Sequence, residues 1–271
     1  MSELTKEQLK GPDRFQKFSK SLIEWVRKNQ NVVGGLGALA IVGGIAYSGY
    51  DFYRTRIEER ARLALYEAQK IKQSFDDKEQ DKKTKEEEAK KPADKKDDKT
   101  KQAKKEEKKD EKPPATQEEL NKLKTDALQA FEKVIGEFPG TAAAHIAVLQ
   151  SSQIFLDDKK LDEAKQVFDK AKEPSSRQGI LLGAFLNQKG KVLAEKGDCE
   201  GAVREWEKVY SNSSLSVWHG DSLVKAGICY EKLSKKDKAI ELYKKASSDE
   251  TDAGRAAKKF LILAERPQPK G

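Results

Sequence analysis

One pattern recurs four times in the C-terminal half of the chain and limits the folds open to it. An alanine precedes an aromatic residue by four positions at Ala127 with Phe131, Ala164 with Phe168, Ala202 with Trp206, and Ala239 with Tyr243. The alanines lie 37, 38 and 37 residues apart. A fixed period of this length, with helical periodicity between the copies, is typical of stacked helical hairpins. The sequence therefore predicts an all-α fold class, in which the hairpins form an α-solenoid.

The fourth copy resembles the tetratricopeptide repeat, a pair of antiparallel helices in which small residues lie where the helices nearly touch and aromatic residues fill the wider gaps. The residues at matching intervals are Gly227, Tyr230, Ala239, Tyr243 and Ala246. Residues 253–265 continue the helical pattern and are predicted to form the capping helix that stacked repeats need at their end.

Aligning the copies predicts a protein-binding groove on the first helices of the hairpins. Its residues are Leu149, Gln153, Leu156, Asn187, Lys191, Ala194, Val224, Ile228 and Glu231. This mixture suits an extended, partly apolar peptide. The known carboxylate clamp of tetratricopeptide repeats has a lysine followed four residues later by an asparagine. Here Asn187 precedes Lys191, so recognition of a C-terminal chaperone tail is not expected. Alternatively, these residues only close the solenoid on itself.

Residues 29–50 carry no charge, and residues 32–47 are almost entirely apolar or glycine. About 20 helical residues span the ~30 Å hydrocarbon core of a bilayer, and glycine is common in membrane helices. We therefore predict a transmembrane helix at 31–53. Two alternatives are a cleaved signal peptide, with 46–48 as a passable cleavage site, and a buried soluble helix.

Small residues recur on one side of this predicted helix. They are Gly37, Ala40, Gly44 and Ser48. Such faces let membrane helices approach closely, so we predict a transmembrane helix contact here. A glycine-rich span also produces this spacing by chance.

A basic amphipathic segment precedes the apolar run. Phe18, Leu22 and Trp25 recur at helical spacing among lysines and arginines, which is typical of a helix on a membrane surface. Five Lys or Arg residues lie within about 20 residues of each end of the span, so the positive-inside rule does not fix its orientation.

Residues 76–114 contain 29 charged residues of 39 and no Val, Ile, Leu or aromatic residue. Such a segment buries too little apolar surface to offset its ordering entropy. It is predicted to be a disordered insertion at 76–116. Because it interrupts the first repeat, the first helix of that repeat is sought at 54–75. An acidic–basic interaction segment is the alternative.

Composition argues against an enzyme, a metal centre or a nucleic-acid-binding protein. The chain has two Cys and two His, with His145 and His219 expected to be ordinary surface or groove residues. It has no Gly-rich phosphate loop and no Gly-x-Ser-x-Gly motif, so no catalytic residue, cofactor or small-molecule substrate is predicted. The net charge of +8 is spread along the chain rather than clustered. Cys199 and Cys229 are either two separate thiols or a disulfide between adjacent repeats.

The whole arrangement resembles the YfgM family of bacterial single-pass inner-membrane proteins. The resemblance rests on the basic lead at 18–28, the Gly-rich span at 32–47, the helix at 56–71 and the repeats through Ile262. It implies an ancillary partner of the Sec translocon and of a membrane-anchored periplasmic chaperone, with the repeats in the periplasm. Unfolded clients are a further class of partner.

The expected organisation has six parts. They are a cytoplasmic basic amphipathic segment (1–30), the transmembrane helix (31–53), the first solenoid helix (54–75), the charged insertion (76–116), the repeats with their capping helix (117–265) and a tail (266–271). The predicted function is a membrane-anchored adaptor that binds other proteins. The alternatives are a scaffold or assembly factor of another cell-envelope complex, including one with cytoplasmic repeats.

Overall fold

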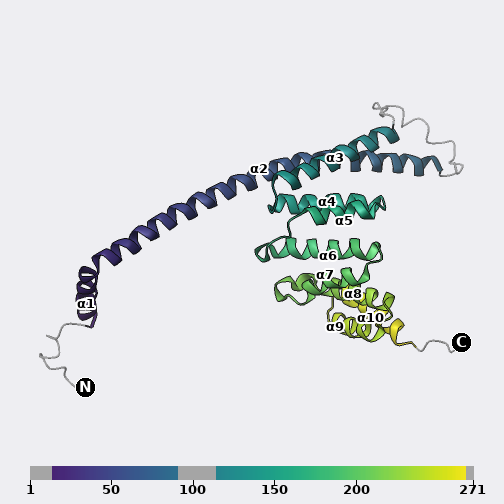
Figure 1. Ribbon diagram of the computed structural model, residues 1–271. Coiled ribbons are helices and arrows are strands. Elements are labelled where there is room, and N and C mark those ends of the chain that lie inside the picture. The colour runs from purple at the N-terminus through teal and green to yellow at the C-terminus, as the bar shows by residue number, and fades with distance from the viewer. Residues whose placement is uncertain (1–13, 91–113, 267–271) are drawn as a thin grey trace, which may run out of the picture. The chain divides into compact units, whose positions relative to one another are not determined.

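The computed structural model describes residues 14–90 and 114–266 (Figure 1). The chain forms two compact units, Met1–Arg56 and Ile57–Gly271, and each is treated by itself. Every regular element in the described ranges is helical. The predictions made for residues 1–13, 91–113 and 267–271 lie outside the described residues.

The first unit contains α1 (Arg14–Lys28) and the beginning of α2 (Gln30–Lys90). Asn29 separates the two helices, and its side-chain Nδ2 donates to the carbonyl of Trp25 at 2.8 Å. The large apolar side chains of both helices are exposed in this unit, from Phe18 in α1 to Tyr53 in α2. Their apolar surface is therefore not covered by the described part of the protein.

The second unit begins within α2, and this part of the helix packs against α3 (Gln117–Glu137). Ala61, Leu65 and Ala68 are buried in one cluster with Ala127 and Phe131. The second part of α2 thus supplies the first helix of the first hairpin, at the position where the sequence pattern lacks one.

The first solenoid helix is longer than expected, because α2 continues to Lys90 beyond the predicted boundary at residue 75. The first part of the predicted disordered insertion is therefore helical. Pairs of opposite charge four residues apart, Lys72 with Asp76 and Glu79 with Lys83, stabilise this extension. Such pairs stabilise a helix without a hydrophobic core. The prediction considered only the low apolar content of this segment and therefore ended the helix too early, at residue 75.

Three further hairpins and a terminal helix follow. They are α4 (Ala142–Asp157) with α5 (Leu161–Lys170), α6 (Gly179–Glu195) with α7 (Cys199–Tyr210), α8 (His219–Lys232) with α9 (Lys236–Ser247), and α10 (Asp252–Glu265) against α9. Short 3-10 helices, η1 (Ser176–Gln178) and η2 (Ser213–Trp218), precede α6 and α8. The predicted order of first and second helices is the observed one.

The turns inside these three hairpins share one geometry. Lys159, Gly197 and Ser234 each have a positive φ, of 59°, 86° and 58°. In each turn the next residue donates its N–H to a carbonyl five positions earlier, as Lys160 does to Phe155 at 2.8 Å. This Schellman-type arrangement satisfies the last carbonyls of the first helix and turns the chain back into the second.

The recurring alanine and aromatic residues form the core of each hairpin. The four alanines are fully buried, and the aromatic rings of Phe131, Phe168, Trp206 and Tyr243 are at most 3% exposed. A Cβ added at Gly190 would lie 2.5 Å from Trp206 Nε1, and one added at Gly227 would lie 2.4 Å from Tyr243 Cε1. The rings of Trp206 and Tyr243 thus each lie on a glycine of the preceding helix, which confirms the tetratricopeptide-like hairpin.

Candidate functional site

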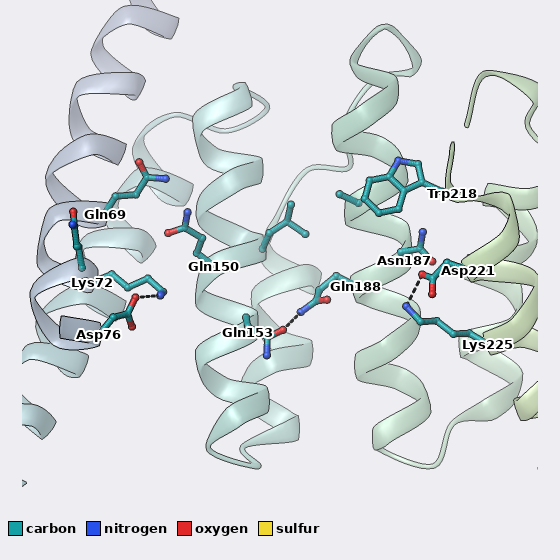
Figure 2. Close-up of a pocket in the computed structure, with 13 residues that line it drawn as sticks. Gln69, Lys72, Asp76, Gln150, Gln153, Asn187, Gln188, Trp218, Asp221 and Lys225 are labelled. Carbon is teal, nitrogen blue, oxygen red and sulfur yellow. Dashed lines mark hydrogen bonds and ion pairs between the residues drawn. The ribbon is translucent and has the colours of Figure 1, made fainter. Parts of the chain in front are cut away.

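A cavity of about 630 Å³ lies along the first helices of the repeats (Figure 2). Thirteen residues line it: Gln69, Lys72, Gln73 and Asp76 from α2; Leu149, Gln150 and Gln153 from α4; Ala184, Asn187 and Gln188 from α6; and Trp218, Asp221 and Lys225 at η2 and α8. The volume falls in the range of ligand-binding pockets, about 300–1,000 Å³. We call it the first-helix cavity.

Side-chain carboxamides dominate the polar lining of the first-helix cavity. Gln69 and Gln73 come from α2, Gln150 and Gln153 from α4, and Asn187 and Gln188 from α6. Gln188 Nε2 donates to Gln153 Oε1 at 2.9 Å, which connects α4 with α6. Each carboxamide offers both a donor and an acceptor without a charge.

The charges in the lining cancel within their own helices. Lys72 pairs with Asp76 on α2, and Lys225 pairs with Asp221 on α8 at 2.6 Å. Both pairs are drawn in Figure 2. Two cations and two anions give a lining with no formal net charge, so the cavity has no general preference for an acidic or a basic ligand.

Asn187 is the most constrained polar group in this lining. Its side chain is 4% exposed, and its Oδ1 lies 3.0 Å from Ser222 Oγ of α8. Its main-chain carbonyl accepts from Trp206 Nε1 at 3.3 Å. The Ser222 hydroxyl also lies 2.8 Å from the main-chain carbonyl of Trp218. Asn187 Nδ2 and Gln150 Oε1 have no hydrogen-bond partner among the described residues.

Trp218 supplies the large apolar surface of the first-helix cavity. Its indole lies against Gly183 of α6, where an added Cβ would be 2.2 Å from Trp218 Cδ1. The ring also packs on the core cluster that contains Leu182 and Phe185. A glycine at 183 thus allows the ring to approach the helix and keeps it at the edge of the cavity.

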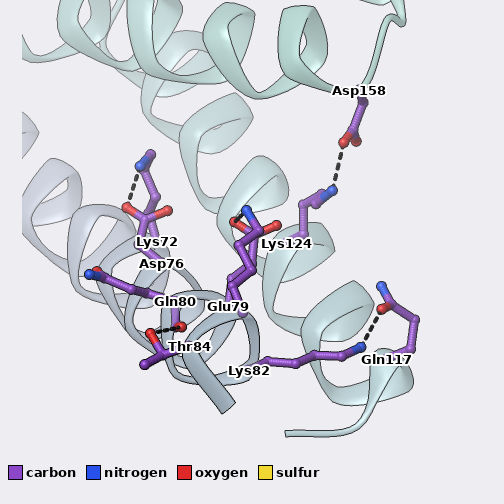
Figure 3. Close-up of polar contacts among 10 residues, drawn as sticks. Lys72, Asp76, Glu79, Gln80, Lys82, Thr84, Gln117, Lys124 and Asp158 are labelled. Atoms are coloured by element: carbon purple, nitrogen blue, oxygen red, sulfur yellow. Dashed lines mark hydrogen bonds and ion pairs between the residues drawn. The ribbon is translucent and has the colours of Figure 1, made fainter. Parts of the chain in front are cut away.

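Polar contacts hold the long helix α2 in place beside the repeats (Figure 3). Lys82 Nζ donates to Gln117 Oε1 of α3 at 2.9 Å. Lys124 of α3 lies 5.3 Å from the ring centroid of Phe75 and also pairs with Asp158, the C-cap of α4, at 2.6 Å. The contacts of α2 with α3 at Phe75 and Lys82 lie next to the part of α2 that lines the cavity, residues 69–76. Helix α3 therefore supports the α2 wall of the cavity.

The structure brings three of the nine predicted groove residues together in this cavity: Leu149, Gln153 and Asn187. Two others, Leu156 and Val224, lie in hydrophobic core clusters. Lys191, Ala194, Ile228 and Glu231 do not line the cavity; Ala194 and Ile228 pack against the core, and Glu231 is exposed. The nine residues lie on the first helices α4, α6 and α8, and a protein-binding role for them stays a prediction.

The sequence analysis missed most of the carboxamide lining. Gln150 and Gln188 are each one residue beyond a predicted position, so a small error in helix rotation hides them. The α2 residues carried no repeat signature, because their helix is separated from α3 by the charged segment. The enrichment of glutamine on successive first helices was the available signal.

The titratable groups with altered pKa values, among them His145 and Glu205, do not line the first-helix cavity. Burial lowers the pKa of His145, which is 1% exposed and was wrongly expected at the surface or in the groove. Burial also acts to raise the pKa of Glu205, but hydrogen bonds from Lys208 and Lys189 outweigh it and hold the pKa below its ordinary value. His145 Nε2 lies 2.9 Å from the carbonyl of Lys172 in the loop after α5, and Glu205 pairs with Lys189 of α6.

Cys199 and Cys229 form a disulfide between the start of α7 and the C-terminal end of α8. Their Cα atoms are 5.1 Å apart, inside the usual range for bonded cysteines. Both residues are buried in the same core cluster. Of the two interpretations open from the sequence, the structure therefore has the disulfide, and it links the third hairpin to the fourth.

The four small residues predicted to contact another membrane helix all lie on α2 and are exposed. A Cβ added at Gly37 or Gly44 would meet nothing within 4 Å. By length and composition, α2 is the one helix in the described ranges that could cross a membrane. A contact at Gly37, Ala40, Gly44 and Ser48 stays a prediction.

Comparison with protein families agrees with this architecture. The family described as "Tetratricopeptide repeat-like domain" matches residues 24–226, and the family described as "Tetratricopeptide repeat" matches residues 221–249. A search of curated proteins finds no match. Tetratricopeptide repeats are typically non-catalytic scaffolds for protein–protein interaction. Because the first match covers more than half of the 271 residues, the chain belongs to the tetratricopeptide repeat-like family.

Proposed function

We propose that this protein is a membrane-anchored adaptor, which uses its tetratricopeptide-like repeats to bind other polypeptides at the inner membrane. The observation that carries the proposal is the continuity of α2, which runs from the apolar stretch into the first hairpin and lines the first-helix cavity. A binding surface joined to an anchor in this way has a raised effective concentration for membrane-bound or emerging partners.

The exposed apolar surface of α2 supports the anchor. Leu39, Ile41, Val42, Ile45 and Tyr47 are each more than 60% exposed. A soluble protein rarely leaves such a continuous apolar surface uncovered, whereas a bilayer covers it and a helix satisfies its own backbone hydrogen bonds there. An apolar helix near the N-terminus can also be a signal sequence, and membrane fractionation of the mature chain separates the two.

The disulfide supports a periplasmic location for the repeats. Disulfides persist in oxidising compartments such as the bacterial periplasm and are rare in the cytosol. The Cys199–Cys229 bond is buried between two hairpins and is the chain's only possible pairing of cysteines. It favours a single-pass topology with the repeats outside the cytoplasm. The numbers of Lys and Arg residues flanking the span are equal, so they do not decide between the two orientations.

For the partners, we propose subunits of the Sec translocon, a membrane-anchored periplasmic chaperone, or unfolded exported clients. This part rests on the resemblance of the basic lead, the Gly-rich span and the degenerate repeats to YfgM-like proteins. A scaffold or assembly factor of another envelope complex shares the same anchor and repeats, and differs only in the proteins that it captures.

Photocrosslinking in native membranes tests the proposed function. A photoreactive amino acid is placed at Gln153 or Gln188, inside the first-helix cavity, and at the exposed Glu207 of α7 as a control. We expect polypeptide adducts from the two cavity positions and few from position 207, and mass spectrometry then identifies the captured chain. Translocon or chaperone adducts support the proposed partners, and adducts with another envelope complex support the scaffold. Equal labelling at all three positions, or no polypeptide adduct, contradicts a binding role for this cavity.

A further inference from the structure

We propose that α1 binds the anionic headgroups of a phospholipid leaflet and lies along its surface as a helix separate from the apolar stretch of α2. The inference rests on the membrane anchor of the proposed function, and it concerns a different surface from the first-helix cavity. It assigns a ligand chemistry to α1, namely negatively charged headgroups above an apolar interior.

The large apolar side chains of α1 gather on one face. They recur at the i, i+4, i+7 and i+8 positions of the helix and are Phe18, Leu22, Trp25 and Val26. Their exposed fractions range from 36% to 65%, so the described part of the protein does not cover this face. With 15 residues at about 1.5 Å each, α1 is roughly 22 Å long and too short to cross a ~30 Å hydrocarbon core. Its apolar face therefore suits the surface layer of a bilayer and not a second span.

The opposite face of α1 is basic. Its cationic residues are Lys17, Lys20, Arg27 and Lys28, and Glu24 is the one acidic residue among residues 17–28. Four basic residues and one acidic residue give this segment a net charge of +3. All four cations are exposed, and none forms an ion pair among the residues that the structure describes. A basic face beside an apolar face containing Trp and Phe is complementary to an anionic lipid surface.

The flank on the other side of the apolar stretch does not have these two free faces. Residues 51–62 contain four arginines and three acidic residues, a net charge of +1. The last part of this flank belongs to the repeats, because Ala61 is buried and Glu58 Oε1 accepts from the main-chain N–H of Ala142 at 3.4 Å. The combination of unpaired cations and an uncovered apolar face thus distinguishes α1 from the second flank.

An interruption of the helical hydrogen bonds separates α1 from α2 (Figure 1). The side-chain Nδ2 of Asn29 donates to the carbonyl of Trp25 at 2.8 Å, in addition to the main-chain N–H of the same residue at 3.0 Å. The main-chain N–H of Val32 donates to the carbonyl of Asn29, three residues earlier, at 3.0 Å, and not to that of Lys28. Because the regular ladder stops here, α1 does not have to continue in the direction of α2 and is able to follow the membrane surface.

Hydrogen–deuterium exchange on the full chain in nanodiscs tests this inference. One nanodisc contains phosphatidylcholine alone, and the other contains phosphatidylcholine and phosphatidylglycerol in equal parts. Each Lys or Arg near an anionic surface favours binding roughly fivefold, so we expect the amides of α1 to exchange at least about tenfold more slowly in the anionic nanodisc. Added salt is expected to reduce this difference, because it screens charges at the surface.

Substitutions separate the contributions of the two faces. A basic-face variant removes four charges and is expected to abolish the difference between the nanodiscs; it combines Lys17→Gln, Lys20→Gln, Arg27→Gln and Lys28→Gln. A matched control removes four exposed charges from the repeats and is expected to keep the difference; it combines Lys122→Gln, Lys133→Gln, Lys258→Gln and Lys259→Gln. An apolar-face variant, Leu22→Ser with Trp25→Ser, is expected to give fast exchange of α1 in both nanodiscs.

Equal exchange of α1 in the two nanodiscs overturns the inference, and so does a basic-face variant that keeps the difference. Protection that arises only when another protein is added also overturns it and assigns α1 to a protein partner. The proposed function fails by other results, namely the absence of polypeptide adducts at Gln153 and Gln188 or the release of the chain by carbonate. A chain that stays in the nanodisc with α1 unprotected contradicts this inference alone.

Discussion

The closest helix–helix contacts in two hairpins are made by a glycine and an aromatic ring. Gly227 of α8 lies beneath Tyr243 of α9, and Gly190 of α6 lies beneath Trp206 of α7. Neither glycine needs a positive φ, so close approach alone explains the residue type. At this scale the repeat pattern predicts the packing directly, because a small residue and a ring at fixed spacing define the distance between the helices.

The substitution Gly227→Ala is expected to lower the free energy of unfolding by about 1–3 kcal/mol, as overpacking of a core usually does. The new Cβ would lie 2.4 Å from Tyr243 Cε1, so the ring has to shift. Gly136→Ala on the exposed face of α3 is the matched control, where an added Cβ meets nothing within 4 Å. Alanine there is expected to stabilise the protein by about 0.5–1 kcal/mol, since glycine is a poor helix former. Urea denaturation measures both, and equal effects would contradict the packing.

A pH-dependent stability is expected from His145. Its Nε2 lies 2.9 Å from the Lys172 carbonyl, so the neutral ring donates from Nε2, and burial lowers its pKa below 6.5 despite the raising effects of that hydrogen bond and Glu58. As pH falls through about 6.5, the unfolded chain binds a proton that the folded chain does not bind. The free energy of unfolding therefore decreases as pH falls below this value, until the pKa of the folded state is passed.

Urea denaturation at about one pH unit above and one below 6.5 measures this contribution. His145→Gln removes the titrating group, so its stability is expected to change less between the two conditions than that of the natural chain. The same loss of stability on acidification in both proteins would show that His145 is not responsible.

At the scale of elements, the second part of α2 behaves as a repeat helix with one buried face. Leu65 is 6% exposed and packs in the cluster with Phe131, whereas Leu63, two residues earlier, is 67% exposed. The pair provides a test within a single helix, because both positions have the same residue and the same helix propensity.

Leu65→Ala is expected to lower the free energy of unfolding by about 2–5 kcal/mol through loss of buried contacts and formation of a cavity. Leu63→Ala is expected to change it by less than about 0.5 kcal/mol. Chemical denaturation followed by circular dichroism reports both values. If the two variants are equally stable, α2 does not belong to the core of the first hairpin.

The disulfide joins two hairpins and is expected to contribute about 3–4 kcal/mol, since it closes a loop with a sequence separation of 30. The double variant Cys199→Ser with Cys229→Ser should be less stable than the oxidised chain by this amount. A thiol reagent added to the unfolded but unreduced protein should label no cysteine. Labelling of two thiols in protein isolated from its native compartment would contradict the disulfide and the argument for an oxidising location.

Most of the element order could be predicted from the sequence, because alanine and aromatic residues at a fixed period record the helical hairpin. The end of α2 could not be predicted, since its last turns are held by charge pairs such as Glu79 with Lys83 rather than by a core.

The lining of the first-helix cavity was only partly predicted. Its lining depends on the rotation of each helix, and one residue of error exchanges Gln150 for Leu149 as the group expected to face the ligand.

For the whole molecule, the apolar stretch of α2 and the charged repeats need different surroundings: the first needs an apolar environment and the second needs water. Residues 32–47 expose a surface that only a bilayer or another protein covers, while 37% of all residues are charged and favour water. A single chain meets both requirements when one helix enters the membrane and the repeats remain outside it. The proposed adaptor requires this arrangement, with the apolar stretch in the bilayer and the repeats in water.

Protease digestion of intact spheroplasts, combined with carbonate extraction of their membranes, tests this arrangement most directly. We predict that the untrimmed chain stays in the carbonate-washed membrane pellet and that external protease removes the repeats while the inner membrane is still sealed. Recovery of the chain in the soluble fraction, or repeats that resist protease until the membrane is broken, would contradict it.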